Sequence, residues 1–415
     1  MKTIKSTFLQ RAPKLLKTSF QLATGKNLDS MVEQLSELKG VPQKLGQLLS
    51  MDVTQFIPDE LKEKLKPLQG SGKALEASVL LGLLKRELSS EQYSSITHFE
   101  QTPLGAGSIG QVHQASLLGH SVVFKIQYPE IEKSILADLA LLGPMTALFE
   151  MVRPETRDFS IMLKEVKAML LNELDYELEV KNMLFFKEAM KGDDRYHVPS
   201  LIPEYSRSKI ICMDYIEGVS LGDFIESSKK DKTLEARTLV AHAMLDLFIE
   251  EFFHLGLVQT DPNFANYLIR NGDQIVLLDF GAVKEFDSRF RKKYFLLLKA
   301  AIENNDDDIL RFGEDLGLVS SADKTEAVEL FVTFMKEAMS YFRKENNPMN
   351  FRDEKITGRL LEMGWKLWKV QRISSPNANL IFLHRKLGGL FSLLKEMQIS
   401  IDLYPYWEKM EKFNQ

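Results

Sequence analysis

The sequence has a single cysteine, Cys212, among its 415 residues. One cysteine cannot form an internal disulfide bond, which excludes a disulfide scaffold and favours a reducing compartment. Cys212 lies in the apolar run 210–213, which predicts a buried strand rather than a catalytic thiol. Stability must therefore come from packing, and a hydrophobic content of 44% in a chain of this length suffices for two or three packed units.

Long apolar runs and an excess of positive charge are missing as well. The most apolar stretch, residues 135–152, is interrupted by Asp138 and Glu150, so it predicts a buried helix rather than a membrane span. The formal net charge is -5, and nothing in the overall composition indicates a nucleic-acid partner. We expect a cytoplasmic protein, with peripheral contact to a membrane as the alternative that its N-terminus raises.

Acidic residues are absent before Asp29, and residues 1–27 form a basic arm with apolar residues at helical spacing. Three interpretations stay open. The arm lies on an anionic membrane surface, it is a transit peptide, or it is solvated and packs one face on the core. Pro13 argues against one continuous helix.

The period of the apolar pattern divides the rest of the chain into three segments. Residues 28–100 have helical spacing and predict a helical extension. Residues 101–217 predict a strand-rich lobe with a helical insert at about 130–192, and residues 218–415 a mostly helical lobe. The α+β pattern has strands expected around Val112 and at 121–126, 198–202, 208–215, 267–270 and 275–279.

Residues 105–112 fit the pattern G-x-G-x-x-G-x-V. Glycines let a backbone approach phosphate oxygens and direct its N–H groups at them. Alone the pattern is weak, because glycine turns are common in hairpins. A dinucleotide-binding fold places it between a strand and a helix, whereas here two strands follow, joined by a turn at Gly119 and His120, as in kinases. The candidate nucleotide-binding residues are Gly105, Ala106, Gly107, Ser108, Gly110 and Val112.

Four further residues complete a candidate phosphoryl-transfer site. Lys125 is flanked by residues of a buried strand, where a lysine is costly unless it is paired; the alternative is an edge lysine in solvent. In kinases this lysine contacts the phosphates of ATP. Asp261 and Asn266 have the spacing of the kinase catalytic loop, and an Asp-Phe-Gly motif begins at Asp279. Asp261 is expected to orient the attacking hydroxyl, and Asn266 and Asp279 to hold Mg²⁺ against the phosphates.

An acidic segment carries Glu173, Asp175 and Glu179 between these motifs. On a helix Asp175 and Glu179 share a face, whereas Glu173 points elsewhere. Without the other motifs such a helix would be a solvated face. The ordered set of motifs predicts a protein-kinase-like, two-lobed α+β fold with an N-terminal helical extension and a helical insert in its N-lobe.

At these residues the sequence resembles the UbiB/AarF-type atypical kinases, which include mitochondrial coenzyme Q-linked members. Lys44 and Gln47 match the family's K-x-G-Q signature, and Glu173 and Asp175 its E-x-D motif. The resemblance implies that Glu179 pairs with Lys125 across the helical insert. It also implies that the K-x-G-Q helix covers the active site, where Lys44 reaches toward the nucleotide pocket.

The sequence departs from the family pattern at two places. Gly105 and Gly107 stand where the family has alanines, which favours a more ordinary kinase-like use of nucleotides. The catalytic loop differs at Gln259, Asn263, Phe264 and Ala265. The kinase-like hinge between the lobes predicts adenine contacts from the backbone of Asp214 and Ile216.

The sequence predicts an atypical kinase or ATPase that uses ATP and Mg²⁺ and acts in isoprenoid quinone or membrane-lipid metabolism, on a small or lipid-like ligand. Only a short segment follows Gly281 before the next helix, and no A-P-E motif appears, so a peptide substrate platform is missing. A non-catalytic, nucleotide-gated scaffold is the first alternative, and a conventional protein kinase the second. The substrate and the oligomeric state stay open, a homodimer included.

Overall fold

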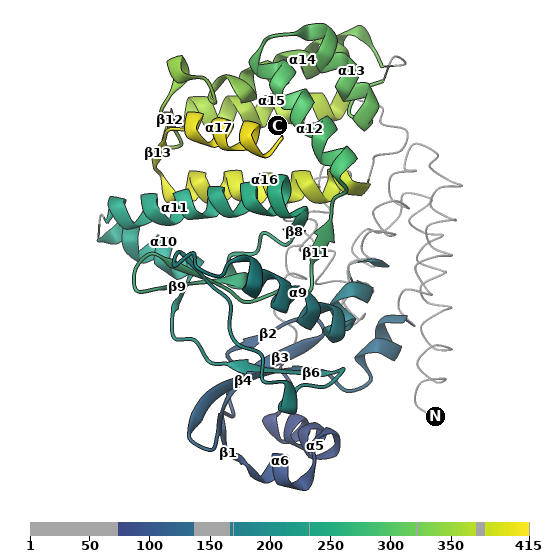
Figure 1. The fold of residues 1–415 in the computed structure, drawn as a ribbon, viewed down its shortest axis with the longest axis vertical. Helices are drawn as coiled ribbons and strands as arrows, with labels where there is room; N and C mark the ends of the chain where they lie inside the picture. Colours follow the sequence, from purple (N-terminus) through teal and green to yellow (C-terminus); the bar gives the residue numbers. More distant parts are fainter. Residues whose placement is uncertain are drawn as a thin grey trace, which may run out of the picture. The chain divides into compact units, whose positions relative to one another are not determined.

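The computed structural model describes residues 74–136, 167–168, 170–231, 233–320, 323–370 and 378–414 (Figure 1). The basic arm, Lys44, Gln47 and the centre of the predicted insert lie outside the described residues. The chain divides into two compact units. The first contains the described residues up to Ala189, with Pro199–Ile216 and Asp279–Ala282; the second contains Met190–Val198, Glu217–Leu278 and Val283–Gln415.

An antiparallel sheet forms the centre of the first unit. Its strand order is β1-β3-β4-β6, and β2 pairs with the other edge of β3. Leu118 and Gly119 have φ of 50° and 89° and form the two-residue turn between β3 and β4, one position earlier than expected. The strands are β1 (Ile96–Phe99), β2 (Gly105–Ala106), β3 (Gly110–Leu117), β4 (His120–Gln127) and β6 (Ile210–Asp214).

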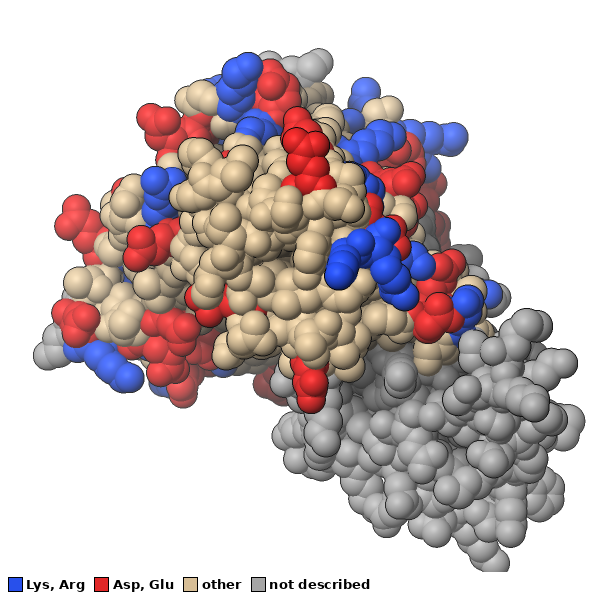
Figure 2. Space-filling model, turned by 90° about the horizontal axis from the view of Figure 1, so that it is seen from below, with Lys and Arg blue, Asp and Glu red and all other residues tan. Residues whose placement is uncertain are grey.

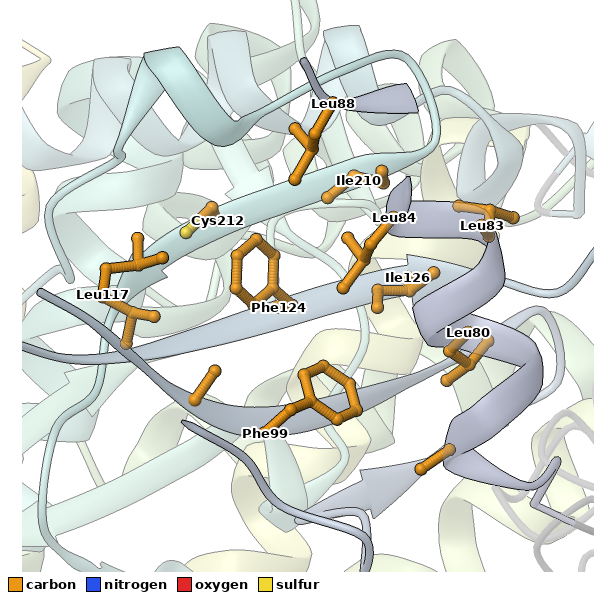
Figure 3. Close-up of a cluster of buried hydrophobic side chains, with 13 residues drawn as sticks. Leu80, Leu83, Leu84, Leu88, Phe99, Leu117, Phe124, Ile126, Ile210 and Cys212 are labelled. Atoms are coloured by element: carbon orange, nitrogen blue, oxygen red, sulfur yellow. The ribbon is translucent and has the colours of Figure 1, made fainter. Parts of the chain in front are cut away.

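One face of this sheet is covered by helix α5 (Ala77–Glu87), whose leucines recur at helical spacing (Figure 3). Leu80 and Leu84 join Phe124 and Cys212 in a buried cluster, in which each large side chain contributes roughly 1.5–3 kcal/mol. Cys212 is fully buried on β6, so the prediction of a buried strand cysteine is confirmed. The short helix α6 (Ser90–Ser94) follows.

Three local expectations are corrected in this unit. The helical spacing of residues 28–100 does not continue to its end, because residues 96–99 form β1 and pair with β3. Residues 198–202 form no strand beyond one isolated bridge at Leu201, and the short strand β5 (Tyr196–His197) precedes them. Asp175 does not share a helix face with Glu179, because α9 (Tyr176–Ala189) begins after it. The 3-10 turn η4 (Pro203–Tyr205) leads toward β6.

The second unit is mostly helical around a small sheet of order β5-β10-β9-β7. Strands β9 (Tyr267–Arg270) and β10 (Gln274–Leu277) agree with the predicted strands, and β7 is Val219–Ser220. Two further strand pairs are β8 (Leu257–Gln259) with β11 (Val283–Glu285), and β12 (Met349–Asn350) with β13 (Ser400–Ile401).

Two helices of this unit, α11 (Leu234–Ile249) and α16 (Ala378–Met397), run side by side (Figure 1). Both are largely apolar, which fits helices packed between other elements. The remaining elements are α10 (Leu221–Lys230), η5 (Glu250–Leu255), η6 (Phe264–Asn266), α12 (Ser288–Ile302), α13 (Asp306–Leu316), α14 (Thr325–Ser340), η7 (Lys344–Asn346), α15 (Glu354–Val370) and α17 (Tyr404–Phe413).

Charge is sparse on the face that Figure 2 shows, where uncharged side chains gather over the middle and charged ones lie around the edge. The sheet sequence shows a similar scarcity, because no Asp, Glu, Lys or Arg lies between Glu100 and Lys125. Among the described helices, none combines the length and apolarity needed to cross a membrane.

Candidate functional site

The glycine pattern forms the turn of a β-hairpin, as expected for a kinase-like loop. β2 pairs with the start of β3, and the N–H of Gly107 donates to the carbonyl oxygen of Gly110 at 2.8 Å. A Cβ on Gly110 would lie 2.4 Å from the carbonyl oxygen of Ile126, so packing requires this glycine. A Cβ on Gly105 would meet nothing within 4 Å. Packing among the described residues therefore does not require a glycine at position 105.

Lys125 lies on β4, between β3 and β6 of the sheet, and is not an edge lysine in solvent. Its Nζ is 2.5 Å from Glu179 Oε1 and 3.2 Å from Asp279 Oδ1. The side chain of Lys125 is 20% exposed and that of Glu179 only 4%. The structure therefore brings together the lysine of the strand, the glutamate of α9 and the aspartate of the Asp-Phe-Gly motif.

The three charges give this cluster one ammonium and two carboxylates. Burial raises the pKa of Glu179 to about 7; Lys125 opposes that rise, while the carboxylate of Asp279 adds to it. Burial by itself lowers the pKa of Lys125, but Asp279 and Glu179 more than offset this and hold it above its ordinary value. With both acids ionised the cluster carries an excess negative charge, which favours a cation beside Asp279.

Helix α9 holds the cluster through side chains on one face, three and four positions apart. Glu179 pairs with Lys125, and Asn182 Nδ2 donates to the carbonyl oxygen of Phe280 at 3.1 Å. Phe186 packs against Phe280 with ring centroids 5.4 Å apart. The N–H of Gly281 donates to Asp279 Oδ1 at 3.2 Å. The backbone around Asp279 is therefore fixed by the helix that positions Glu179.

The two acids of the E-x-D motif have different contacts. Glu173 Oε2 accepts a hydrogen bond from Ser108 Oγ at 3.0 Å, which ties the motif to the tip of the glycine loop. Asp175 Oδ1 accepts from the N–H of Leu178 at 2.9 Å and so occupies the N-cap position of α9. Within the described residues, Glu173 therefore contacts the nucleotide loop, whereas Asp175 stabilises the helix that carries Glu179.

The predicted hinge leaves the sheet at the end of β6. Asp214 stands opposite Val122 of β4, and its N–H donates to the carbonyl oxygen of Ser200 at 3.0 Å. The amide of Asp214 is thus already used, so an adenine contact from this residue falls to its carbonyl oxygen. Ile216 follows at the end of the first unit.

The catalytic-loop residues lie together in the second unit, where Asp261 and Asn266 are both buried. Asn266 Nδ2 is 3.4 Å from Asp261 Oδ2, and the Asn266 carbonyl oxygen accepts from the N–H of Leu278 at 3.0 Å. Because the amide nitrogen of Asn266 is directed at Asp261, its side-chain oxygen points the other way. This oxygen is the atom that Mg²⁺ would use.

Two buried cations behind this loop were not predicted. Arg385 Nη2 is 2.6 Å from Asp261 Oδ1, and Lys386 Nζ is 3.0 Å from Glu251 Oε2 and 3.3 Å from the hydroxyl of Tyr267. Both residues belong to α16. Two successive basic residues inside an apolar helix are a signal that could have found them, because buried cations need acidic partners.

Each unit carries groups of the kind that bind ATP and Mg²⁺. In the first unit Lys125 provides a cation for phosphates and Asp279 a hard oxygen, and in the second unit the side chain of Asn266 provides another hard oxygen. The hydroxyl of Tyr176 is buried and has no hydrogen-bond partner among the described residues. The Tyr176 ring centroid lies 5.5 Å from Lys125 Nζ, and a Cβ on Gly110 would come within 3.0 Å of its oxygen. An unused donor thus lies beside both the lysine and the glycine loop.

The sheet with its Lys–Glu–Asp cluster, together with a helical unit that carries an Asp…Asn loop, defines a protein of the protein-kinase-like fold. Comparison with known families makes this specific: the model of the ABC1 atypical kinase-like domain matches residues 68–312. The chain belongs to this family, the UbiB/AarF family of atypical kinases, as its sequence motifs predicted.

Curated relatives agree with the family. The chain is 30% identical over 386 residues to the mitochondrial atypical kinase COQ8 of Saccharomyces cerevisiae, covering 92% of this chain and 75% of that protein. It is 28% identical over 399 residues to the probable serine/threonine-protein kinase abkA of Dictyostelium discoideum, covering 91% and 69%. The structure of Rv3197 from Mycobacterium tuberculosis, a complex with erythromycin, covers 100% of both chains at a TM-score of 0.64 and 22% identity, and this likeness concerns the fold alone.

Proposed function

We propose that this protein is an ATP- and Mg²⁺-dependent atypical kinase or ATPase that acts on a small or lipid-like substrate. The observation that carries the proposal is the contact of Lys125 with Glu179 and Asp279 in the first unit. A lysine held by two carboxylates in this way is poised for phosphates, and the excess negative charge suits a metal ion. The family resemblance adds isoprenoid quinone or membrane-lipid metabolism as the setting of the reaction.

Each residue has a role in the proposed reaction. The backbone N–H groups of residues 105–110 and the ammonium of Lys125 would bind the phosphates, and the backbone of Asp214 and Ile216 the adenine. Asp279 and Asn266 would hold Mg²⁺, which supplies charge neutralisation along the phosphates. Asp261 would orient the hydroxyl or water that attacks.

A small substrate is favoured over a protein because only a short segment, which contains β11, separates the Asp-Phe-Gly motif from α12. Residues 283–285 form β11 and pair with β8, and the carboxylate of Asp287 caps α12 by accepting from the N–H of Phe290 at 2.9 Å. A protein kinase uses a long activation segment at this position to bind its peptide. In addition, we propose that Lys44 and Gln47, which lie outside the described residues, take part in the reaction and that the basic arm contacts a membrane.

The test replaces Asp279 by asparagine, which removes a charge but keeps the size. We expect the affinity for ATP in the presence of Mg²⁺ to fall at least about tenfold and phosphate release to fall with it, because the metal loses its carboxylate. Asp273→Asn is the matched control, since Asp273 is exposed in the turn between β9 and β10. Calorimetry and a phosphate-release assay measure both variants. Binding and turnover unchanged in Asp279→Asn would exclude the proposed metal role.

A nucleotide-gated scaffold is the second candidate. Asp261 is engaged by Arg385 and Asn266, and the loop departs from the family pattern at Gln259 and Asn263. The two functions differ in turnover. Tight binding of ATP and Mg²⁺ without phosphate release, with and without lipid vesicles or a quinone-precursor mimic, would favour the scaffold.

A further inference from the structure

A buried ion pair joins the C-terminal helix α16 to the catalytic loop. The side chain of Arg385 is 1% exposed and that of Asp261 9%, and their Nη2 and Oδ1 atoms are 2.6 Å apart. Asn266 Nδ2 lies on the other carboxylate oxygen at 3.4 Å. The two oxygens of Asp261 are thus held by different partners, which determines how the plane of the carboxylate is turned.

Two further contacts hold α16 against the same loop. A Cβ on Gly389 would lie 2.1 Å from Cβ of Pro262, so only glycine allows the helix backbone to come this close. One position after Arg385, the ammonium of Lys386 is 3.0 Å from Glu251 and 3.3 Å from the hydroxyl of Tyr267, which follows the loop directly. α16 therefore contacts the loop at Asp261 and Pro262 and again just after its end.

We propose that α16 is the support of the catalytic loop and that Arg385 is a positioning residue for Asp261. The guanidinium compensates the buried charge of the aspartate and sets the direction of its oxygens, while Gly389 sets the distance between helix and loop. The proposal rests on the proposed function only in giving Asp261 its role toward the attacking hydroxyl. It extends the site beyond the matched family model, which ends at residue 312.

Electrostatics gives Arg385 this role rather than a purely stabilising one. A buried aspartate without a cation would be strongly destabilised, so some compensation is obligatory. An arginine fork provides directional donors, whereas a lysine provides a point charge. The choice of arginine therefore predicts that orientation matters as well as charge, and that a lysine at this position would retain the fold but lose part of the turnover.

The experiment compares Arg385→Lys and Arg385→Gln in the full chain with a matched control, Arg237→Gln. Arg237 is also buried in the second unit, and its Nη1 donates to the backbone carbonyl oxygen of Met397, the last residue of α16, at 2.7 Å; this control therefore weakens another anchor of the same helix that does not contact the loop. Two quantities are measured: steady-state phosphate release from ATP with Mg²⁺, and hydrogen exchange of the peptide that covers residues 259–267, with α11 as an internal reference.

We expect Arg385→Gln to lower kcat about ten- to hundredfold while KM for ATP changes less than about threefold, because the proposed nucleotide contacts lie in the first unit. Arg385→Lys should fall between this variant and the wild type. Exchange in residues 259–267 should rise in Arg385→Gln and stay near the wild-type level in Arg237→Gln.

The outcomes distinguish the positioning role of Arg385 from the proposed turnover of ATP. Equal exchange of the loop in Arg385→Gln and Arg237→Gln would overturn the positioning role, whatever the activity. A loop that loosens only in Arg385→Gln while the wild type releases no phosphate would support the positioning role and exclude the proposed turnover. A kcat that falls equally in all variants would show a loss of stability and would overturn the positioning role as well.

Discussion

The buried carboxyl of Glu179 makes a prediction about pH that can be worked out from the structure. Burial raises its pKa from 4.5 to about 7, with Lys125 opposing the rise and Asp279 adding to it. Below about pH 4.5 the group is protonated in the folded and the unfolded chain alike. Between about pH 4.5 and 7 the unfolded chain loses this proton and the folded unit keeps it. The stability of the first unit should therefore fall as pH rises through this window and level off above it.

The magnitude follows from the width of the window. A pKa raised from 4.5 to about 7 corresponds to a few kcal/mol in the unfolding free energy, at ~1.4 kcal/mol for each pH unit of the window. Glu179→Gln keeps the shape of the side chain and cannot titrate, so it should abolish this slope. Glu177→Gln, an exposed position on the same helix, should leave the slope unchanged and controls for the loss of a surface acid.

Hydrogen exchange of α9 and β4 peptides in denaturant, corrected for the intrinsic effect of pH, measures the local stability that this prediction concerns. Because the chain has two units, a single melting temperature would mix two transitions. Addition of ATP and Mg²⁺ should lower the pKa of Glu179, so binding near pH 6.5 should release protons in the wild type and not in Glu179→Gln. A wild-type slope that persists in Glu179→Gln would refute the reasoning.

Two pairs of glycines make further predictions. Gly110→Ala should cost about 1–3 kcal/mol of stability because its Cβ would overlap a backbone carbonyl of β4. The Cβ of Gly107→Ala would make only an ordinary contact at 3.6 Å, so this variant should fold like the wild type. Hydrogen exchange of the first unit, measured across a denaturant titration, distinguishes the two variants. Gly389→Ala should lower stability and loop protection because its Cβ would overlap Pro262, while Gly388→Ala meets nothing within 4 Å and should gain up to ~1 kcal/mol of helix propensity. Equal effects at Gly388 and Gly389 would contradict the close approach of α16.

Much of the first unit could be predicted from local pattern. A turn between two strand-like segments after the glycine pattern predicted the β3–β4 hairpin, and the apolar run 210–213 predicted the buried position of Cys212. The Gly loop, lysine, Asp…Asn loop and Asp-Phe-Gly motif predicted a kinase-like fold, because phosphoryl transfer needs these residue types; the K-x-G-Q and E-x-D motifs predicted the family. Local pattern was less informative at residues 198–202, which form one isolated bridge at Leu201 and no strand.

The sequence by itself thus determined the family and predicted which residues carry the chemistry, while the tertiary structure decided which side chains contact them. Arg385 and Asp261 are 124 positions apart, and no periodicity of either segment indicates that they pair. The same holds for Asn182 and Phe280, 98 positions apart, and for the separate contacts of Glu173 and Asp175. The physical reason is that a buried charge or amide must find its partner wherever packing brings one, and that choice is made by the whole fold rather than by neighbours in the chain.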